Sequence, residues 1–263
     1  LIDLGIDSDP IKDGQVLTSA ISVVTILDIR DKSITDLTGI EDFTGLEELY
    51  CFNNITGDGN DNAITTLDVS NSPNLIRLYC QDNQITDLNI SGLTKLQAVI
   101  TSNNPFVNTT LDFHLNPDLF YLVCQNNGLT NLNISGLTRL TVLDVWTNQL
   151  TTLDVSNNPD LYYLDCDGNQ FTSINVTGLA KLETFYCSGN KLSSINVTGT
   201  STLNTFYCYL NTPSGIDIFV DNVAAENAIS TDFWLKFPNF FYTYCTSVLT
   251  TPWTSAPGGR RRN

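Results

Sequence analysis

One pattern recurs through most of this chain and limits the folds open to it. The pattern begins Leu75-x-x-Leu78-x-Cys80-x-x-Asn83 and continues Ile85-x-x-Leu88-x-Ile90. Copies start at Leu96, Leu119, Leu140, Leu161, Leu182 and Leu203, with spacings of 21 or 23 residues, and two earlier copies start at Val24 and Leu46. Self-similarity at this period indicates a solenoid, in which each turn of the chain buries its apolar residues against the next. We therefore expect about nine turns.

Each position of the pattern has a structural role. The leucines fill the interior, and the Leu-x-Cys stretch predicts a short strand with alternate side chains pointing inward. Strands of successive turns would stack about 4.8 Å apart into a parallel sheet. An asparagine follows each strand and can satisfy backbone groups of neighbouring turns. This column contains Asn54, Asn83, Asn104, Asn127, Asn148, Asn169, Asn190 and Asn211, and Lys32 takes its place in the first turn.

This pattern resembles the leucine-rich repeat, and its 21-residue form is similar to the bacterial class called IRREKO. Segments such as Leu150-Thr-Thr-Leu-Asp-Val-Ser156 and Leu129-Thr-Asn-Leu-Asn-Ile-Ser135 carry the second half of that signature. The segments Leu1–Asp7, Gln15–Thr18 and Ile34–Ile40 further resemble the start of secreted flavobacterial repeat proteins. The resemblance implies a leucine-rich-repeat solenoid with a parallel sheet on its concave face and an irregular or short-strand convex face. It also implies a secreted or bacterial cell-surface location.

The charge of the chain narrows its possible partners. The formal net charge is −16, from 12 basic and 28 acidic side chains. Such a surface repels phosphate backbones and anionic membranes, so we expect no nucleic-acid partner. No apolar run reaches the ~18 residues of a membrane-spanning helix, and we expect no membrane insertion.

The two ends of a repeat stack need caps, because the outermost turns otherwise expose their core. We assign residues 1–23 to an amino-terminal cap, 24–211 to the solenoid, 212–255 to a carboxyl-terminal α/β cap and 256–263 to a flexible tail. The second cap is expected to contain a strand at 216–220, a helix at 222–236 and a closing strand at 240–245. In the first cap, Leu1–Leu4 is expected to be the end of a helix that stops at Gly5.

The cysteines follow the repeat. Six of the seven occupy one slot, namely Cys51, Cys80, Cys124, Cys166, Cys187 and Cys208. Thr101 and Val145 fill the same slot in two other turns, which indicates a buried position and not a disulfide or zinc site. Cys245 lies in the second cap. We expect it to be unpaired, and a link to Cys208 stays open.

Many residues expected to point outward from the sheet are aromatic. Tyr and Trp combine a flat apolar surface with a polar edge, which suits sugar rings and protein hot spots alike. We predict as ligand-binding residues Tyr50, Tyr79, Tyr121, Asp144, Trp146, Tyr163, Asp165, Asp167, Tyr186 and Tyr207. The alternative is that the aromatic side chains only pack on one another across neighbouring turns.

Asp144, Asp165 and Asp167 form the densest acidic group on this face. Nearby carboxylates can perform acid–base chemistry, but an open sheet provides little desolvation, and no nucleophile or histidine accompanies them. We therefore expect no catalytic residues and no enzymatic activity, and we favour a basic group on a partner.

An insertion between Asn54 and Ile64 is rich in oxygen ligands. Its residues Asp58, Asn60 and Asp61 are candidate calcium ligands, with Asp7, Asp9 and Asp13 as a second candidate set. A solvated loop is the alternative, and no other cofactor is expected.

These features predict a non-catalytic extracellular binding module that recognises a polysaccharide or glycan through its aromatic concave face. The second hypothesis is a protein-binding adhesin or interaction domain, and the third is a passive spacer in a larger surface protein. A glycan binder should depend on aromatic residues and little on salt. A protein binder that uses the acidic residues should weaken as salt rises.

Overall fold

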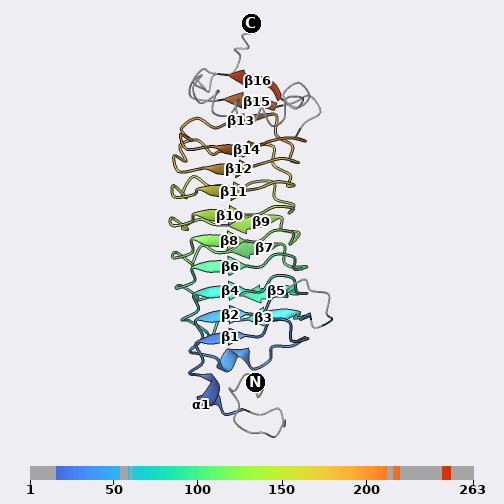
Figure 1. Cartoon of the computed structure of the whole chain (residues 1–263), viewed down its shortest axis with the longest axis vertical. Coiled ribbons are helices and arrows are strands. Elements are labelled where there is room, and N and C mark those ends of the chain that lie inside the picture. The colour runs from blue at the N-terminus through green and yellow to red at the C-terminus, as the bar shows by residue number, and fades with distance from the viewer. Residues whose placement is uncertain (1–15, 54–58, 60, 212–215, 220–244, 250–263) are drawn as a thin grey trace.

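The computed structural model describes residues 16–53, 59, 61–211, 216–219 and 245–249, and it forms an elongated stack of turns (Figure 1). One parallel sheet of nine strands runs along the stack in the order β1-β2-β4-β6-β8-β10-β11-β12-β14. Its strands are β1 (Ile26–Asp28), β2 (Glu48–Tyr50), β4 (Arg77–Tyr79), β6 (Ala98–Ile100), β8 (Tyr121–Val123), β10 (Val142–Asp144), β11 (Tyr163–Asp165), β12 (Thr184–Tyr186) and β14 (Thr205–Tyr207). The predicted fold, a leucine-rich-repeat solenoid of about nine turns, is confirmed.

Neighbouring strands pair so that equivalent repeat positions lie side by side. The central residue of β10, Leu143, pairs with Leu122 of β8 and Leu164 of β11. All three leucines are fully buried. Burying one leucine side chain stabilises a fold by roughly 1.5–3 kcal/mol, so the repeated column gives every turn the same source of stability.

The cysteine slot forms a second buried column beside the strands. The six cysteines in it are free thiols and are all buried. Desolvation raises the pKa of Cys51 to about 12. Toward the carboxyl-terminal end, Phe185 and Phe206 replace the central leucine and stack with ring centroids 5.5 Å apart. The expectation of a thiol-lined core agrees with this geometry.

An asparagine ladder joins successive turns where the strands end. The Oδ1 of Asn148 accepts hydrogen bonds from the backbone N–H groups of Asn127 and Leu129, at 3.1 and 3.0 Å. Its Nδ2 donates to the carbonyls of Cys124 and Val145, at 3.0 and 2.9 Å. One side chain thereby satisfies four backbone groups that would be costly to bury without partners.

The insertion in the second turn moves the ladder to a residue that the repeat pattern did not identify. Asn54 lies outside the described residues, whereas Asn62 makes the ladder contacts. Its Nδ2 donates to the carbonyls of Ile29 and Cys51, at 2.9 and 3.1 Å, and its Oδ1 accepts from the N–H of Ile34 at 2.8 Å. The repeat therefore resumes after the insertion, where an amide can reach both the first and the second turn.

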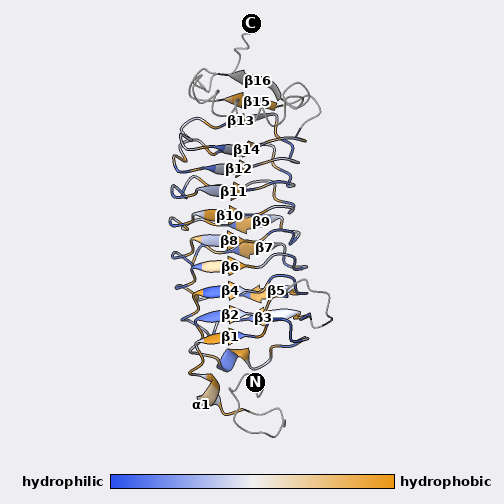
Figure 2. Ribbon diagram, in the orientation of Figure 1, coloured by the Kyte–Doolittle hydropathy of each residue, from blue (hydrophilic) through white to orange (hydrophobic). Residues whose placement is uncertain are grey.

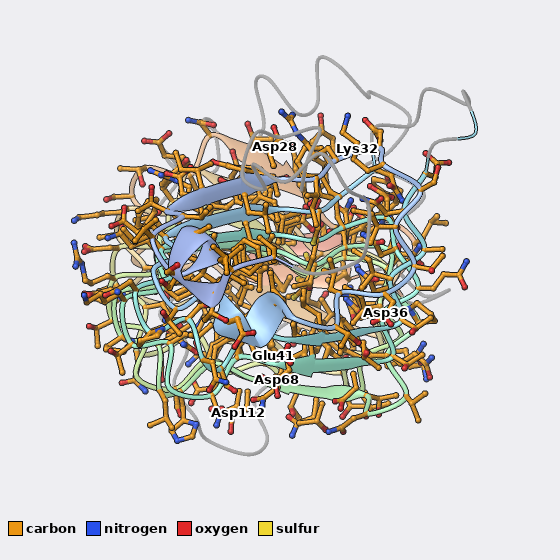
Figure 3. All side chains as sticks on the ribbon, turned by 90° about the horizontal axis from the view of Figure 1, so that it is seen from below. Asp28, Lys32, Asp36, Glu41, Asp68 and Asp112 are labelled. Carbon is orange, nitrogen blue, oxygen red and sulfur yellow. The ribbon has the colours of Figure 1, made fainter. Side chains whose placement is uncertain are left out.

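A second, interrupted set of short strands lies across the core from the nine-stranded sheet. β3 (Thr66–Asp68) pairs with β5 (Asp87–Asn89), and β7 (Thr110–Asp112) pairs with β9 (Asn131–Asn133). Figure 3 looks along the stack and places Asp28 of β1 on one side, with Asp68 and Asp112 on the other. The solenoid thus has two opposite strand-bearing sides.

The strand pairs follow a period of two turns within the 21-residue repeat. The third residue of the second strand alternates between Asp and Asn from residue 68 to residue 175, and the next turn repeats asparagine at Asn196. We call the two kinds aspartate turns (Asp68, Asp112 and Asp154) and asparagine turns (Asn89, Asn133 and Asn175). In the first pair, Asn89 Nδ2 donates to Asp68 Oδ2 at 3.0 Å.

Ion pairs on a neighbouring loop follow the same alternation. Arg139 of an asparagine turn pairs with Asp118 of the preceding aspartate turn at 2.8 Å, and Lys181 pairs with Asp160 at 2.5 Å. The first aspartate turn has Asn74 in this position, and Lys95 of the next turn donates to its side chain at 2.7 Å, so each aspartate turn is joined to the asparagine turn that follows it.

The ends of the stack depart from the repeat. At the amino-terminal end, the described residues contain the short helix α1 (Thr18–Ile21), and the helix end expected at Leu1–Leu4 lies outside them. A 3-10 helix, η2 (Ile40–Asp42), follows in the first turn. Ile40 and Phe43 are buried there against the core.

At the other end, the second strand set continues beyond the last turn. Isolated bridges join Asp154 to Asn175 and Asn175 to Asn196. The strands that follow are β13 (Ser194–Asn196), β15 (Ile216–Phe219) and β16 (Cys245–Leu249), paired in that order. β15 lies within the strand predicted at 216–220. The described closing strand starts at Cys245 and runs beyond the predicted 240–245, and the helix predicted at 222–236 lies outside the described residues.

Hydropathy follows this architecture. In Figure 2 the hydrophilic colour gathers on the loops at the edges of the stack, while strands such as β1, β9 and β10 are hydrophobic. Among the described residues, no helix combines the length and the apolar character needed to cross a membrane.

Candidate binding face

The nine-stranded sheet presents three columns of side chains outward, and together they form what we call the nine-strand face. The columns contain the first residue of each strand, the third residue, and the residue two positions after the strand. In β10 these are Val142, Asp144 and Trp146. The third-residue column contains Asp28, Tyr50, Tyr79, Ile100, Val123, Asp144, Asp165, Tyr186 and Tyr207, each partly buried. The strip predicted to bind ligands corresponds to this face.

Two tyrosines near the amino-terminal end form a cluster with charged neighbours. Tyr50 and Tyr79 contact edge-to-face, with ring centroids 5.3 Å apart. The Tyr50 hydroxyl donates to Glu48 at 2.5 Å, and this hydrogen bond raises the pKa of Tyr50 to about 12. Arg77 forms an ion pair with the same carboxylate, and the Arg30 guanidinium lies 5.9 Å from the Tyr50 ring centroid. The polar groups of Tyr50, Glu48 and Arg77 are therefore engaged within the protein.

A second aromatic cluster lies near the carboxyl-terminal end. Tyr163 and Tyr186 meet edge-to-face at 5.9 Å between centroids, and Tyr186 and Tyr207 lie 5.2 Å apart at a tilted angle. Tyr209 meets Tyr207 edge-on at 6.4 Å. The alternative considered from sequence, that aromatic side chains pack across neighbouring turns, describes these contacts correctly. Ring packing leaves part of each tyrosine exposed.

The three aspartates come together beside this second cluster. Asp144 and Asp165 are directly paired in β10 and β11. Backbone N–H groups hold their carboxylates: that of Trp146 donates to Asp144 at 3.1 Å, and that of Asp167 donates to Asp165 at 3.1 Å. The carboxylate of Asp167 in turn accepts from the N–H of Ser188 at 2.5 Å. Asp144 and Asp165 are thus fixed by the loop after their own strand, and Asp167 by the equivalent loop of the next turn.

Burial raises the pKa of all three carboxyl groups. Desolvation, with the added negative charges of Asp144 and Asp167, raises the pKa of Asp165 to about 7, against the backbone hydrogen bond that lowers it. Desolvation raises the pKa of Asp167 to about 6, and it also raises that of Asp144. The expectation that an open sheet gives little desolvation was wrong, because the tyrosines and the neighbouring turns cover the sides of these groups.

None of the ion pairs among the described residues includes these three carboxylates. Arg30 pairs with Asp28, Arg77 with Glu48, His114 with Asp112, Arg139 with Asp118 and Lys181 with Asp160. The carboxylates therefore lie close to one another without a basic partner from the described chain, which makes them attractive to an external cation.

The remaining predicted residues flank the aspartates. Tyr121 of β8 is half-buried, and desolvation together with Tyr79 and Asp144 raises its pKa. Trp146 is 47% exposed and is the most open aromatic residue of the predicted set. Tyr163 belongs to both groups, because it meets Tyr186 and forms a side-chain hydrogen bond with Asp165.

The predicted ligand-binding set leaves out two kinds of residue that this face contains. Arg30 contacts the Tyr50 and Phe52 rings, although its turn was read only for its missing asparagine. The column containing Trp146 also holds Ser102 and Ser188, whose hydroxyl groups are buried. Reading this column by its repeat position identifies all of these residues.

The candidate calcium ligands are described only in part. Asp58 and Asn60 lie outside the described residues, as do Asp7, Asp9 and Asp13, whereas Asp61 is exposed. The neighbouring Asn62 is committed to the asparagine ladder, so its amide oxygen is not free for a cation. Within the described part of the chain, no group of three His, Cys, Asp or Glu residues is arranged to hold a metal ion.

No family model matches this sequence, and no curated protein matches it either. Among solved structures, the chain is similar to the functional domain of InlJ from Listeria monocytogenes, which includes a cysteine ladder. The identity is 25%, over 79% of this chain and 61% of that one, with a TM-score of 0.41.

Two further structures are similar over much of the chain. An internalin (InlF) from Listeria monocytogenes shares 20% identity over 82% of this chain and 88% of its own, with a TM-score of 0.40. YopM from Yersinia enterocolitica shares 20% identity over 68% of this chain and 44% of its own, with a TM-score of 0.49. The chain thus spans less than two thirds of InlJ and of YopM. At these TM-scores the likenesses carry no argument about function, and the IRREKO-like class stays an expectation from sequence.

Proposed function

We propose that this chain is a non-catalytic binding module that holds a protein partner on the nine-strand face. Basic side chains of the partner would contact Asp144, Asp165 and Asp167. The arrangement of these carboxylates, close together and without a basic neighbour beside partly exposed tyrosines and Trp146, supports the proposal most directly. A guanidinium or ammonium group can bond the carboxylates and lie against the aromatic rings, and both interactions strengthen where water is partly excluded.

The aromatic geometry favours a protein over the glycan that sequence suggested first. A sugar ring stacks on an open aromatic face, whereas Tyr163, Tyr186 and Tyr207 turn edges or tilted faces toward one another. Half-buried tyrosines beside charged groups suit the core of a protein interface. A glycan on this face stays the second candidate because of the exposed ring of Trp146.

The test uses a peptide array of graded charge, probed with the full chain. We expect selection of peptides that combine Arg or Lys with aliphatic or aromatic residues, with binding that weakens as salt rises. The double substitution Asp144→Asn and Asp165→Asn should reduce affinity about tenfold or more, as loss of charge-assisted contacts predicts. An array without any preference for basic peptides would contradict the proposal.

The chain offers a matched control on its opposite side. Asp68→Asn with Asp112→Asn removes the same charge from the second strand set, which Figure 3 places across the core from Asp28. Binding should survive in this control. Equal losses in both variants would mean that net charge alone, and not the nine-strand face, attracts the peptides. If the chain instead binds neutral oligosaccharides and only Trp146→Ala loses that binding, the glycan candidate is favoured.

The proposal includes no catalytic step, although Asp165 has the raised pKa of a general acid. Glycoside hydrolysis also needs a second carboxyl group placed across a cleft from the first. We expect no release of reducing sugar from soluble polysaccharides. Release that disappears with Asp165→Asn would overturn this part of the proposal.

The location outside a bacterial cell rests on the sequence resemblance alone. Protease treatment of intact cells that produce the protein tests it, since only a surface-exposed chain would be removed.

A further inference from the structure

The side opposite the nine-strand face contains a depression where the second strand set is interrupted. β9 pairs with β7 and with no other described strand, so the following Thr152–Asp154 segment is separate from it. A depression of about 430 Å³ opens at this junction between an asparagine turn and the next aspartate turn. Its volume lies within the range of about 300–1,000 Å³ that is typical of small-molecule sites.

Three apolar side chains form the floor of this depression. Leu132, Leu153 and Ile174 come from successive turns, and they are 7%, 9% and 8% exposed. They are the inward residues of the second strands, and the open junction leaves their outer edges accessible. Such a floor suits the C–H face of a sugar ring, which is apolar although the ring edge is polar.

The rim carries polar side chains with unused hydrogen-bonding capacity. In two pairs of turns, the Asp and Asn residues bond each other: Asn89 donates to Asp68, and Asp112 is bonded to Asn133. The third pair, Asp154 and Asn175, is joined by a backbone bridge but by no described side-chain hydrogen bond, and both residues line the depression.

The local hydrogen bonds leave specific atoms of this open pair available. Asp154 Oδ1 accepts from the N–H of Ser156 at 2.9 Å, and Asn175 Oδ1 accepts from Thr177 at 3.1 Å. Asp154 Oδ2 and Asn175 Nδ2 therefore remain to accept from and donate to a ligand. The exposed Ser173 hydroxyl, also on the lining, adds a group that can do both.

The charge of the lining selects against anions. Asp154 is the one ionisable residue among the lining residues, and no basic side chain is with it. Hydrogen bonding to Ser156 lowers the Asp154 pKa, so the group is ionised at neutral pH. A phosphate or an acidic sugar would be repelled, whereas a neutral hydroxyl donates well to a carboxylate.

We propose that this depression is a binding site for a neutral saccharide. One ring lies on Leu132, Leu153 and Ile174, one of its hydroxyl groups donates to Asp154, and another accepts from Asn175. The site is separate from the nine-strand face, so it does not depend on the function proposed for that face.

The test titrates the full chain with neutral trisaccharides (cellotriose, xylotriose and mannotriose) and with trigalacturonate, observed by ligand NMR or calorimetry. We expect at least one neutral probe to bind with a dissociation constant of about 1 mM or tighter, and trigalacturonate not to bind. Ser173→Trp fills the depression, and Asn175→Ala removes the donor. Each should weaken binding of the neutral probe about tenfold or more, corresponding to about 1.4 kcal/mol.

Matched variants separate a local effect from damage to the fold. Thr66→Trp places the same bulk on an exposed position of β3, and Asn89→Ala removes the equivalent amide with its bond to Ser91. Both should bind as the unchanged chain does. Absence of saturable binding by every neutral probe, equal binding by Ser173→Trp, or loss with Trp146→Ala alone would each overturn the proposal.

Discussion

A buried amide contributes more to this fold than its size suggests. Asn148 is 5% exposed and bonds four backbone groups of two successive turns. An ionised aspartate in its place could accept but not donate, and an apolar residue could do neither. The repeat therefore requires asparagine itself at this position.

The first prediction concerns that amide. Asn148→Ala leaves four backbone groups without partners, and we expect a loss of about 3 kcal/mol or more in the free energy of unfolding. Chemical denaturation measures it. Asn157, exposed and without positive φ, is the control, and Asn157→Ala should cost less than about 1 kcal/mol. Similar losses in the two variants would contradict the role given to the ladder.

A column of left-handed residues lies beside the ladder, and one member fits it poorly. Asp82, Asn103 and Asn126 have φ between 52° and 59°, and their side chains bond one another at 2.7 and 2.8 Å. Thr147 continues the column at φ 54°, although β-branched residues rarely adopt this region. Its exposed side chain makes no bond of the kind that joins its three predecessors.

The second prediction follows from this strain. Thr147→Asn introduces a residue that tolerates left-handed backbone and can extend the amide column, so stability should rise by about 1 kcal/mol. Thermal unfolding measures the change. Thr151→Asn, at an exposed position without positive φ, should change stability by less than about 0.5 kcal/mol. A destabilised Thr147→Asn variant would mean that the threonine side chain has a contact worth more than the strain.

Strand pairing brings like charges together at the scale of elements. Asp165 of β11 faces Asp144 of β10 and Tyr186 of β12, with Tyr163 on its own strand and Asp167 in the next loop. Because the folded-state pKa of about 7 lies above the unfolded value of about 3.9, the folded state binds the proton more tightly. The Asp165 carboxyl group therefore costs the folded state no stability below about pH 4, where it is protonated in both states. The cost develops as pH rises from about 4 to 7 and stays constant above that range.

The third prediction isolates this penalty. Asp165→Asn should leave the melting temperature nearly unchanged at pH 4 and raise it by a few degrees at pH 8, where the carboxylate is charged in the unchanged chain. Scanning calorimetry at both pH values gives the difference. A variant that is less stable at pH 8 would show that the Asp165 carboxylate makes favourable contacts that outweigh its desolvation.

The cysteine column gives the fourth prediction. Burial raises the pKa of Cys51, Cys80, Cys124 and Cys166, and the six thiols of the column are inaccessible. Only a thiolate reacts rapidly with an alkylating reagent. We expect mass spectrometry to detect no iodoacetamide adduct on these six residues at pH 8 until denaturant is added. Rapid labelling of Cys124 or Cys166, in the middle of the stack, would indicate local opening.

At the scale of the whole molecule, stability is a sum over neighbouring turns, because each turn contacts only those before and after it. Deletion of complete turns should therefore preserve cooperative folding. The alternation of aspartate and asparagine turns adds a condition, since Asp118 pairs with Arg139 and Asp160 with Lys181.

The fifth prediction compares two deletions. Removal of residues 128–169, two turns, brings Asp118 next to Lys181 and should reduce the denaturant m-value by about two ninths without a further penalty. Removal of residues 128–148, one turn, brings Asp118 next to Asp160 and Asp112 next to Asp154. We expect this shorter deletion to be the less stable one at low salt, and the difference to shrink as salt rises.

The sequence predicted the solenoid because its signal is repeated in every turn, so that a substitution such as Thr101 or Val145 in the cysteine slot does not hide it. It did not locate Asn62, because an insertion interrupts the spacing there. The outward direction of Tyr163 and Asp165 followed from strand alternation, but their burial depends on side chains of the turns before and after them. The depression lined by Leu132, Leu153 and Ile174 was not predicted, because it results from a missing strand pair. Pairing between two turns cannot be read from the sequence of one repeat. Whether the ligand residues predicted on the nine-strand face bind a partner stays a prediction.

The coupling of each aspartate turn to the asparagine turn that follows it also restricts how such a gene can grow. A duplication that copies a single aspartate turn places two carboxylates against each other twice over, at the strand end and on the neighbouring loop. A duplication that copies both turns reproduces every pair. Growth by unequal recombination is therefore expected to add an aspartate turn together with the asparagine turn that follows it, whereas an asparagine turn can be repeated alone, as Asn175 and Asn196 show.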